Sequence, residues 1–340
     1  MIRGTTQQIL LPPLLRTDWD AAEASVPDVL ELRNGTMTLR GQWRKRPGFA
    51  RHSTAGTEAI TALIPEDTGY VISGQTVYRL GETTAITTLS GNERATWAVD
   101  KGTVLLTNGG VPIALNSDDE TITLVSDAPA QFIETLDSYV LLAPYGNPTR
   151  FRWSAAGNRN SYPPANFNDV LRERGSIRMM KKLRRELYFF CDHHIEIWVD
   201  VGGELVWGRR DVIRKGTPAG HSVVVANDTL YWYGDDGDFY GLNANQAQNI
   251  SQVIRATLDT IASSNRAAIY GFDCRAEHVI RWFAPIEGLC FTYDYVHNVW
   301  WFDDSWHNGP IRLPIASYME LDGRAYMGDY NATGRVYTWS

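Results

Sequence analysis

The 340-residue sequence contains little cysteine and no long apolar run. Its three cysteines, Cys191, Cys274 and Cys290, show no CxxC spacing, which argues against a disulfide framework and a zinc knuckle and fits folding in a reducing cytoplasm. No stretch approaches the ~20 apolar residues of a membrane-spanning helix. The short apolar run at residues 9–15 is interrupted by two prolines, so we expect no signal peptide.

Positive charge is also scarce, because 32 Lys and Arg residues face 39 Asp and Glu residues, and the formal net charge is −7. A sequence-independent nucleic-acid binder needs an excess of Lys and Arg to displace phosphate counterions. The charge balance therefore argues against that class of protein. A net charge of this size is also normal for a soluble domain.

Aromatic residues and glycine are abundant, with 12 Trp, 16 Tyr and 29 Gly. This mixture is typical of many short aromatic strands joined by glycine turns. The length fits either two ordinary domains or one large all-β unit.

A hairpin pattern repeats along the chain. Residues 227–243 (NDTLYWYGDDGDFYGLN) and 321–339 (LDGRAYMGDYNATGRVYTW) both run from a polar turn through an aromatic strand and a Gly-Asp turn into a second strand. Looser versions lie at residues 69–80, 103–115, 138–153, 186–199 and 279–293. About seven hairpins at a spacing of roughly 30 to 50 residues indicate the blades of a β-propeller.

Most hairpins follow a further strand-like segment, the candidate inner strand of a blade. These segments are residues 59–64, 95–99, 132–136, 177–181, 222–226 and 269–273.

The last hairpin ends at Trp339 and Ser340 without an outer strand, and residues 36–40 (TMTLR) are the available N-terminal donor. We therefore predict an all-β propeller of six or seven blades over residues 36–340, closed by an N-terminal strand and preceded by an arm at residues 1–35.

One helix is expected to interrupt the strands, at residues 251–263. Val253, Ile254, Leu258 and Ile261 fall on one face, and Ser251 is a plausible N-cap.

Four stretches, taken in order, carry a resemblance to a known family. They are RKRPGF (residues 44–49); RFRWSAAGN, NFNDVLRERGSIRMM and ELYFFCDHHIEIWVDVGG in the middle of the chain; RKGTPAG, YWYGDDGDFYGLN and NISQVIRATLD farther on; and CFTYDYVHNVWWFDD. In this order they resemble the tail nozzle or hub proteins of short-tailed bacteriophages, the group that includes the packaged-DNA stabilisation proteins of lambdoid short-tailed phages. The likeness covers most of residues 40–340.

The resemblance implies a structural virion protein without enzymatic activity or cofactor. It would form a ring, expected to be a hexamer, beneath the portal and its adaptor, after assembly in the host cytoplasm. The ring would continue the channel for double-stranded DNA without sequence-specific binding, and would help to retain and then eject the genome. Acidic walls would keep DNA from adhering in a narrow bore.

Basic clusters and tryptophans are the candidate interface or channel residues. A solvated loop is the ordinary interpretation of a basic run, and the alternative is a patch that pairs with a neighbouring subunit or contacts DNA. Core packing is expected for at least one Trp among Trp300, Trp301 and Trp306, while another could anchor an interface. The candidates are Arg40, Arg44, Lys45, Arg46, Arg178, Lys181, Lys182, Arg184, Arg185, Trp301 and Trp306.

Asp235, Asp236 and Asp238 invite a glycosidase interpretation, since paired carboxylates hydrolyse glycosides on some propellers. Asp and Gly are also favoured turn residues, so we expect a turn role. A propeller glycosidase and a propeller scaffold that binds partner proteins both remain alternatives to the tail protein.

Cys191, His193 and His194 could ligate a metal ion. Adjacent side chains in a strand point to opposite faces, however, so here too we expect a turn and no metal site.

Overall fold

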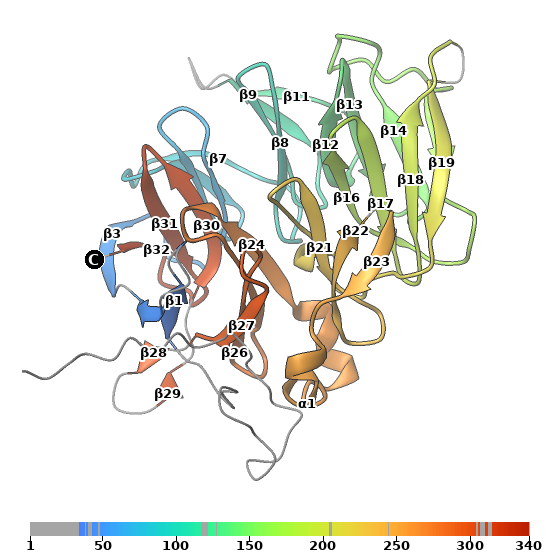
Figure 1. Cartoon of the computed structure of the whole chain (residues 1–340). Coiled ribbons are helices and arrows are strands. Elements are labelled where there is room, and N and C mark those ends of the chain that lie inside the picture. Colours follow the sequence, from blue (N-terminus) through green and yellow to red (C-terminus); the bar gives the residue numbers. More distant parts are fainter. Residues whose placement is uncertain are drawn as a thin grey trace, which may run out of the picture.

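Seven four-stranded antiparallel sheets follow one another around a ring and form a seven-bladed β-propeller (Figure 1). The computed structural model describes residues 34–37, 39, 43–46, 48–116, 122–126, 128–203, 206–243, 245–303, 305–306, 310–311 and 315–339. The all-β propeller expected from the sequence is confirmed, with seven blades. The arm expected at residues 1–35 lies outside the described residues except for its last two.

Six blades run in chain order from the ring axis outward. Blades 1 to 3 are β4 (Ile60–Ile64), β5 (Tyr70–Ser73), β6 (Thr76–Arg79) and β7 (Ala85–Thr88); β8 (Thr96–Asp100), β9 (Thr103–Thr107), β10 (Ile113–Asn116) and β11 (Ile122–Leu124); and β12 (Ala130–Leu136), β13 (Tyr139–Pro144), β14 (Arg150–Trp153) and β15 (Phe167–Asp169). Blades 4 to 6 are β16 (Ile177–Leu183), β17 (Glu186–Cys191), β18 (Ile195–Asp200) and β19 (Trp207–Ile213); β20 (Val224–Ala226), β21 (Thr229–Tyr233), β22 (Phe239–Asn243) and β23 (Gln246–Asn249); and β24 (Tyr270–Cys274), β25 (Val279–Ala284), β26 (Leu289–Asp294) and β27 (Val299–Phe302).

All six predicted inner strands and all seven predicted hairpins are found in these positions. The fourth strand of a blade runs antiparallel to its first, so each new inner strand starts at the same end of the ring axis. Side chains that precede inner strands of different blades are therefore brought to one level of the axis.

The seventh blade joins the two ends of the chain. Its strands are β30 (Ile315–Leu321), β31 (Arg324–Asp329), β32 (Arg335–Trp339) and, outermost, β3 (Phe49–Thr54). Figure 1 shows the blue β3 beside the red β32. Phe49 is the register partner of Trp339, and their rings stack with centroids 4.8 Å apart.

The N-terminal closing strand is thus confirmed, but the predicted donor, residues 36–40, is wrong. Residues Gly35–Met37 form β1 and pair with β2 (Trp43–Lys45) in a separate hairpin. The backbone of β1 already pairs with β2 in this hairpin. Phe49 of β3, by contrast, pairs with Trp339 of β32 and stacks on its ring. Arg40 lies outside the described residues.

The β1–β2 hairpin covers the side of blade 6. The rings of Trp43 and Trp301 meet edge to face with centroids 5.1 Å apart, and Met37 is buried beside Val299. The backbone N–H of Asn34 donates to the Phe302 carbonyl at 2.9 Å.

A buried ionic chain joins this hairpin to blade 6, and we call it the closure cluster: Arg46, Glu277, Arg281 and Asp303. The guanidinium groups of Arg46 and Arg281 each lie 5.5 Å from the ring centroid of Trp339 in blade 7. Arg281 donates to Asp303 at 2.9 Å and to Glu277 at 2.8 Å, while Arg46 lies 3.4 Å from the other Asp303 oxygen. The Arg281 and Asp303 side chains are 1% and 0% exposed. Burial works to lower the pKa of Arg281, but the Glu277 and Asp303 carboxylates outweigh it and raise that pKa.

Aromatic side chains fill the spaces between blades. Phe239 packs against Trp282 and Trp300 at centroid distances of 4.4 and 5.3 Å, and all three are nearly inaccessible to solvent. Trp282 also donates from Nε1 to the Ser222 carbonyl at 2.8 Å, which ties blade 6 to blade 5.

The predicted helix at residues 251–263 is only partly present. The segment forms η2 (Gln252–Ile254) and α1 (Arg255–Leu258), and a further 3-10 turn, η3, spans Ser263–Ala268. The Ser251 hydroxyl does not cap a helix, because it accepts from the Phe239 N–H at 2.8 Å and donates to Asp238 at 3.2 Å.

The remaining short elements are η1 (Gly220–Ser222), η4 (Arg275–Glu277), β28 (Ser305–Trp306) and β29 (Pro310–Ile311). Across the described part of the chain, no helix is long and apolar enough to span a membrane.

Candidate functional site: the axial pocket

A pocket of about 600 Å³ lies on the ring axis, and every inner strand contributes to its wall. Apolar side chains such as Met179, Val223 and Phe272 line it together with charged side chains. Its volume falls within the ~300–1,000 Å³ of pockets that hold small ligands.

Arg94 reaches across the axis at the end where the inner strands begin. It precedes β8 in blade 2, yet its Nη2 donates to the Ala316 carbonyl in blade 7 and its guanidinium lies 4.3 Å from the Tyr270 ring centroid in blade 6. No carboxylate among the described residues pairs with it. Burial lowers the pKa of Arg94, although a guanidinium stays charged at neutral pH.

Lys181 and His221 join Arg94 in this pocket. Lys181 has no ion-pair partner within the described ranges. Burial, followed by the charges of Arg94 and Lys181, lowers the pKa of His221 to about 3, so this imidazole is neutral at physiological pH. We call Arg94 and Lys181 the axial cations.

Gly220 fixes the backbone beside His221. A Cβ atom at this position would lie 1.8 Å from the Arg178 carbonyl oxygen, so no larger residue fits without a backbone shift. The close approach of η1 to β16 brings the backbone of blade 5 beside Arg178 of blade 4.

Asp273 lies near the other end of inner strand β24. Burial raises its pKa to about 6, against the opposing charge of Arg275, whose Nε is 3.7 Å away. One Asp273 oxygen, Oδ1, is buried and makes no hydrogen bond within the described structure. Glu134, by contrast, accepts from the Thr135 and Lys182 backbone N–H groups.

The basic run predicted around residues 178–185 is divided by the fold. Four of its five members have a carboxylate partner: Arg178 with Asp192, Lys182 with Glu134, Arg184 with Asp228 and Arg185 with Asp137. Three of these partners come from neighbouring blades. Only Lys181 faces the axial pocket without a carboxylate among the described residues.

Among the N-terminal basic candidates, Arg46 is the one whose side chain the structure describes, and it does not line the axial pocket. Arg44 and Lys45 lie in β2, and Arg46 is buried in the closure cluster with its guanidinium 4.9 Å from the Phe49 ring centroid. A role at an interface or in a DNA channel stays a prediction for these residues.

The packing role expected for tryptophan is confirmed. Trp300 and Trp301 are 2% and 0% exposed, so both side chains are packed in the interior. The β1–β2 hairpin covers Trp301, and an interface role stays a prediction for Trp301 and Trp306. Trp306 forms part of β28.

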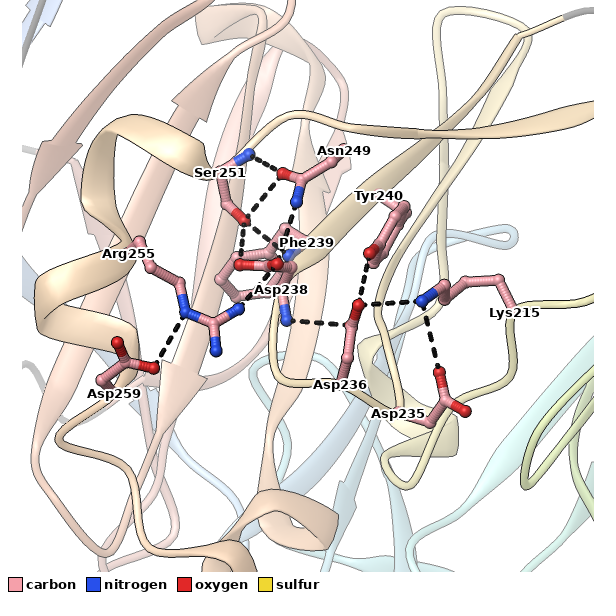
Figure 2. Close-up of polar contacts among 10 residues, drawn as sticks. All are labelled: Lys215, Asp235, Asp236, Asp238, Phe239, Tyr240, Asn249, Ser251, Arg255 and Asp259. Carbon is pink, nitrogen blue, oxygen red and sulfur yellow. Dashed lines mark hydrogen bonds and ion pairs between the residues drawn. The ribbon is translucent and has the colours of Figure 1, made fainter.

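The three aspartates of the β21–β22 hairpin have the expected turn role, and Figure 2 shows how each is held. Asp236 accepts from Lys215 at 2.8 Å and from the Tyr240 hydroxyl at 2.6 Å. Burial works to raise the pKa of Asp236, but these hydrogen bonds hold it below its usual value. Asp238 accepts from Arg255 at 2.7 Å and Asn249 at 2.9 Å. The network fastens α1 and the residue 215 loop to the hairpin.

The turn interpretation also holds for His193 and His194, which lie between β17 and β18. The His193 side chain is 71% exposed, whereas His194 is fully buried 3.6 Å from Glu196. The buried Cys191 has a pKa raised by burial. Among the described residues, no three His, Cys, Asp or Glu side chains gather as a metal site would require.

Sequence reasoning missed Arg94 and His221. Both immediately precede a predicted inner strand, residues 95–99 and 222–226. Because all inner strands of a propeller start at one level, their positions could have indicated that these side chains meet on the axis.

Comparison with known proteins supports the fold and no more. No protein-family model and no curated protein matches the sequence. A solved structure of YCF48 bound to D1 peptide has a TM-score of 0.52 at 9% identity, covering 89% of this chain and 99% of that one. The computationally designed protein Ika8 has a TM-score of 0.50 at 11% identity, over 85% and 99% of the chains.

A third similar structure is PorZ, a surface component of the type-IX secretion system of Porphyromonas gingivalis. Its TM-score is 0.51 at 9% identity, and the match covers 85% of this chain but 37% of PorZ. The fold places the chain in the class of seven-bladed β-propellers.

Proposed function

We propose that this protein is a non-catalytic β-propeller that binds a partner protein through its axial pocket. The observation that carries the proposal is the charge of the axial cations. The fold pairs the four basic side chains around Lys181 with carboxylates. Two carboxylates, Glu134 and Asp273, also line the pocket, but they lie beside Lys182 and Arg275. Arg94 and Lys181 therefore have no ion-pair partner among the described residues. Desolvating a cation without a partner costs free energy, which a ligand of opposite charge recovers.

The similar structures are compatible with this role. YCF48 was solved with a bound peptide, and a propeller ring offers a rigid frame around a single axial pocket. Because fold does not fix function, the pocket and its charges carry the weight of the proposal.

The test is to capture partners from source-cell lysate with the wild-type chain and with Arg94→Met/Lys181→Met. Each partner found is purified, and its binding is measured again in isolation. The proposal expects a partner that binds the wild type and loses affinity for the double variant. Partners that bind both proteins equally would place the interaction elsewhere and overturn the axial assignment.

A ring component of a short-tailed phage tail is our second proposal. It is supported by the order of the four family-like stretches and by where they fall in the fold. RKRPGF spans β2 and the start of β3 at the closure of the propeller, and the middle stretches span the passage from blade 3 to blade 4. The partners would then be further copies of this chain, expected as a hexamer in the virion tail, and the portal-adaptor, with double-stranded DNA passing through the assembled ring.

Negative-stain electron microscopy tests this second proposal. The purified chain is imaged alone and after mixing with phage particles stripped of their tails. Rings with a central hole, or new density at the portal vertex, are expected. Monomers that never attach to the particles would remove the tail assignment and leave the axial binding proposal intact.

A further inference from the structure

We infer that the axial pocket binds a carboxylate carried by an extended peptide segment of the partner protein, with Arg94 and Lys181 as the residues that hold it. This inference rests on the proposed binding function and names the chemistry of its ligand. A guanidinium and an ammonium that share a pocket complement an anionic group.

Arg94 is held in place before any ligand arrives. Its side chain is fixed by the Ala316 carbonyl and by the face of the Tyr270 ring, from two blades on the far side of the axis. A guanidinium has five N–H donors, and only one hydrogen bond from Arg94 is made to the described residues. Arg94 is only partly buried and lines the pocket.

Lys181 supplies the second charge from the neighbouring side of the ring. Arg94, Lys181 and His221 all line the same pocket. The neutral imidazole adds a further N–H donor without adding charge repulsion. A carboxylate entering this region would meet donors from blades 2, 4 and 5.

The rest of the pocket favours a peptide over a free phosphate or a nucleic acid. Met179, Val223 and Phe272 offer apolar walls to neighbouring side chains, and the buried Asp273 Oδ1 is an unused acceptor for a peptide N–H. A pocket of about 600 Å³ admits a few residues, which excludes a duplex. The acidic net charge of −7 also opposes a polyanion.

An exposed aromatic residue marks an approach to the pocket. Tyr330 is 44% exposed, and its ring stacks on Tyr270 with centroids 6.3 Å apart. Tyr270 in turn lies under Arg94. Tyrosine is enriched at protein interfaces, so a segment crossing Tyr330 would be guided toward the guanidinium.

The experiment uses the full chain and fluorescein-labelled octapeptide mixtures whose flanking positions are Val, Leu, Ala, Ser and Thr. The central residue is Glu, Gln or phosphoserine, and binding is measured by fluorescence anisotropy, with inorganic phosphate as a competitor. The proteins compared are the wild type, Arg94→Met, Lys181→Met and, as matched control, Arg324→Met, whose arginine is exposed on β31 away from the pocket. Thermal unfolding checks that each variant is folded.

The inference expects the wild type and Arg324→Met to bind the Glu peptides at least about tenfold more tightly than the Gln peptides, the ratio that ~1.4 kcal/mol produces. Arg94→Met and Lys181→Met should each lose this preference. Equal affinity for Glu and Gln peptides, no binding of either, a preference unchanged in both pocket variants, or binding only of phosphoserine and inorganic phosphate would overturn it. If a purified partner still requires the axial cations while the peptides show no preference, the binding function stands and only the carboxylate assignment fails.

Discussion

The closure cluster and the axial cations place positive charge inside the same propeller in opposite ways. In the closure cluster, Arg281 has carboxylates at 2.8 and 2.9 Å and is almost inaccessible to solvent. On the axis, Arg94 has a carbonyl and an aromatic ring but no carboxylate within the described structure. In the first arrangement the positive charge is balanced by carboxylates of the same chain, whereas in the second we propose that a ligand supplies the negative charge. Paired burial thus serves the fold, and unpaired charge in a pocket indicates a ligand.

Removing the shared carboxylate of the closure cluster is the harshest test of this contrast. Asp303→Ala removes a carboxylate that lies beside both Arg281 and Arg46 in a buried place, and breaking a buried pair in this way typically costs ~3–5 kcal/mol. We expect a loss of about that size in the free energy of unfolding, measured by urea denaturation. The control is Asp259→Ala, whose side chain is 56% exposed in its pair with Arg255 and should cost less than about 1 kcal/mol. Equal losses in the two variants would contradict the prediction.

Replacing one arginine in each region sharpens the comparison. Arg281→Met strands Glu277 and Asp303 and should cost about 3–5 kcal/mol. Arg94→Met strands no carboxylate and removes a charge that burial disfavours, so the free energy of unfolding should stay the same or rise by up to about 2 kcal/mol. A large loss of stability in Arg94→Met would mean that this residue serves the fold.

The pH dependence of stability should reveal the axial carboxyl group. The folded-state pKa of Asp273 is about 6, above its ordinary 3.8, so the native state holds a proton that the unfolded chain releases. Stability from this group is present below about pH 4 and is lost as the pH rises through 6. Asp273→Asn should therefore be more stable than the wild type at pH 7, on the order of 1 kcal/mol, with no difference below about pH 4. Thermal melts from pH 3.5 to 8 would measure it, and a pH-independent difference would refute the assignment.

The smallest effect is expected at the network of Figure 2. Lys215 pairs with Asp235 and Asp236 but is close to solvent, so Lys215→Met should lower the free energy of unfolding by less than about 1 kcal/mol. High salt should weaken the wild-type pair and narrow the difference further. Calorimetry at two salt concentrations would show this, and a loss as large as that of Asp303→Ala would place Lys215 with the closure cluster.

The blades were predictable because strand alternation and turn residues are local signals. The local residue pattern at 177–181 and at 186–199 is enough to predict the strands found there. The donor strand was not predictable in the same way, since residues 36–40 and Phe49–Thr54 both suit a β-strand and only pairing distinguishes them. The helix is shorter than predicted, and the Ser251 hydroxyl bonds to Phe239 and Asp238 at the start of β22 in the same blade.

The site required information that the local pattern lacks. The basic run was visible in the sequence, but Asp137 and Asp228, which neutralise Arg185 and Arg184, come from the blades on either side. Arg94 was invisible as a site residue because its contacts, Ala316 and Tyr270, lie across the ring. Whether a basic side chain has a carboxylate partner depends on contacts between blades. The folded ring is therefore needed to see that Arg94 and Lys181 have no such partner among the described residues.

The pairing of β3 with β32 also has a consequence for biosynthesis. Blade 7 takes its outer strand from the first described part of the chain and its other three from the last, so it cannot form until the ribosome has released both. Blades 1 to 6 can form as their residues emerge, while β3 waits with an unpaired edge that could associate with other chains. Pairing with β32 therefore protects the edge of β3, and a chain that lacks residues 335–339 would leave that edge open to aggregation and proteolysis.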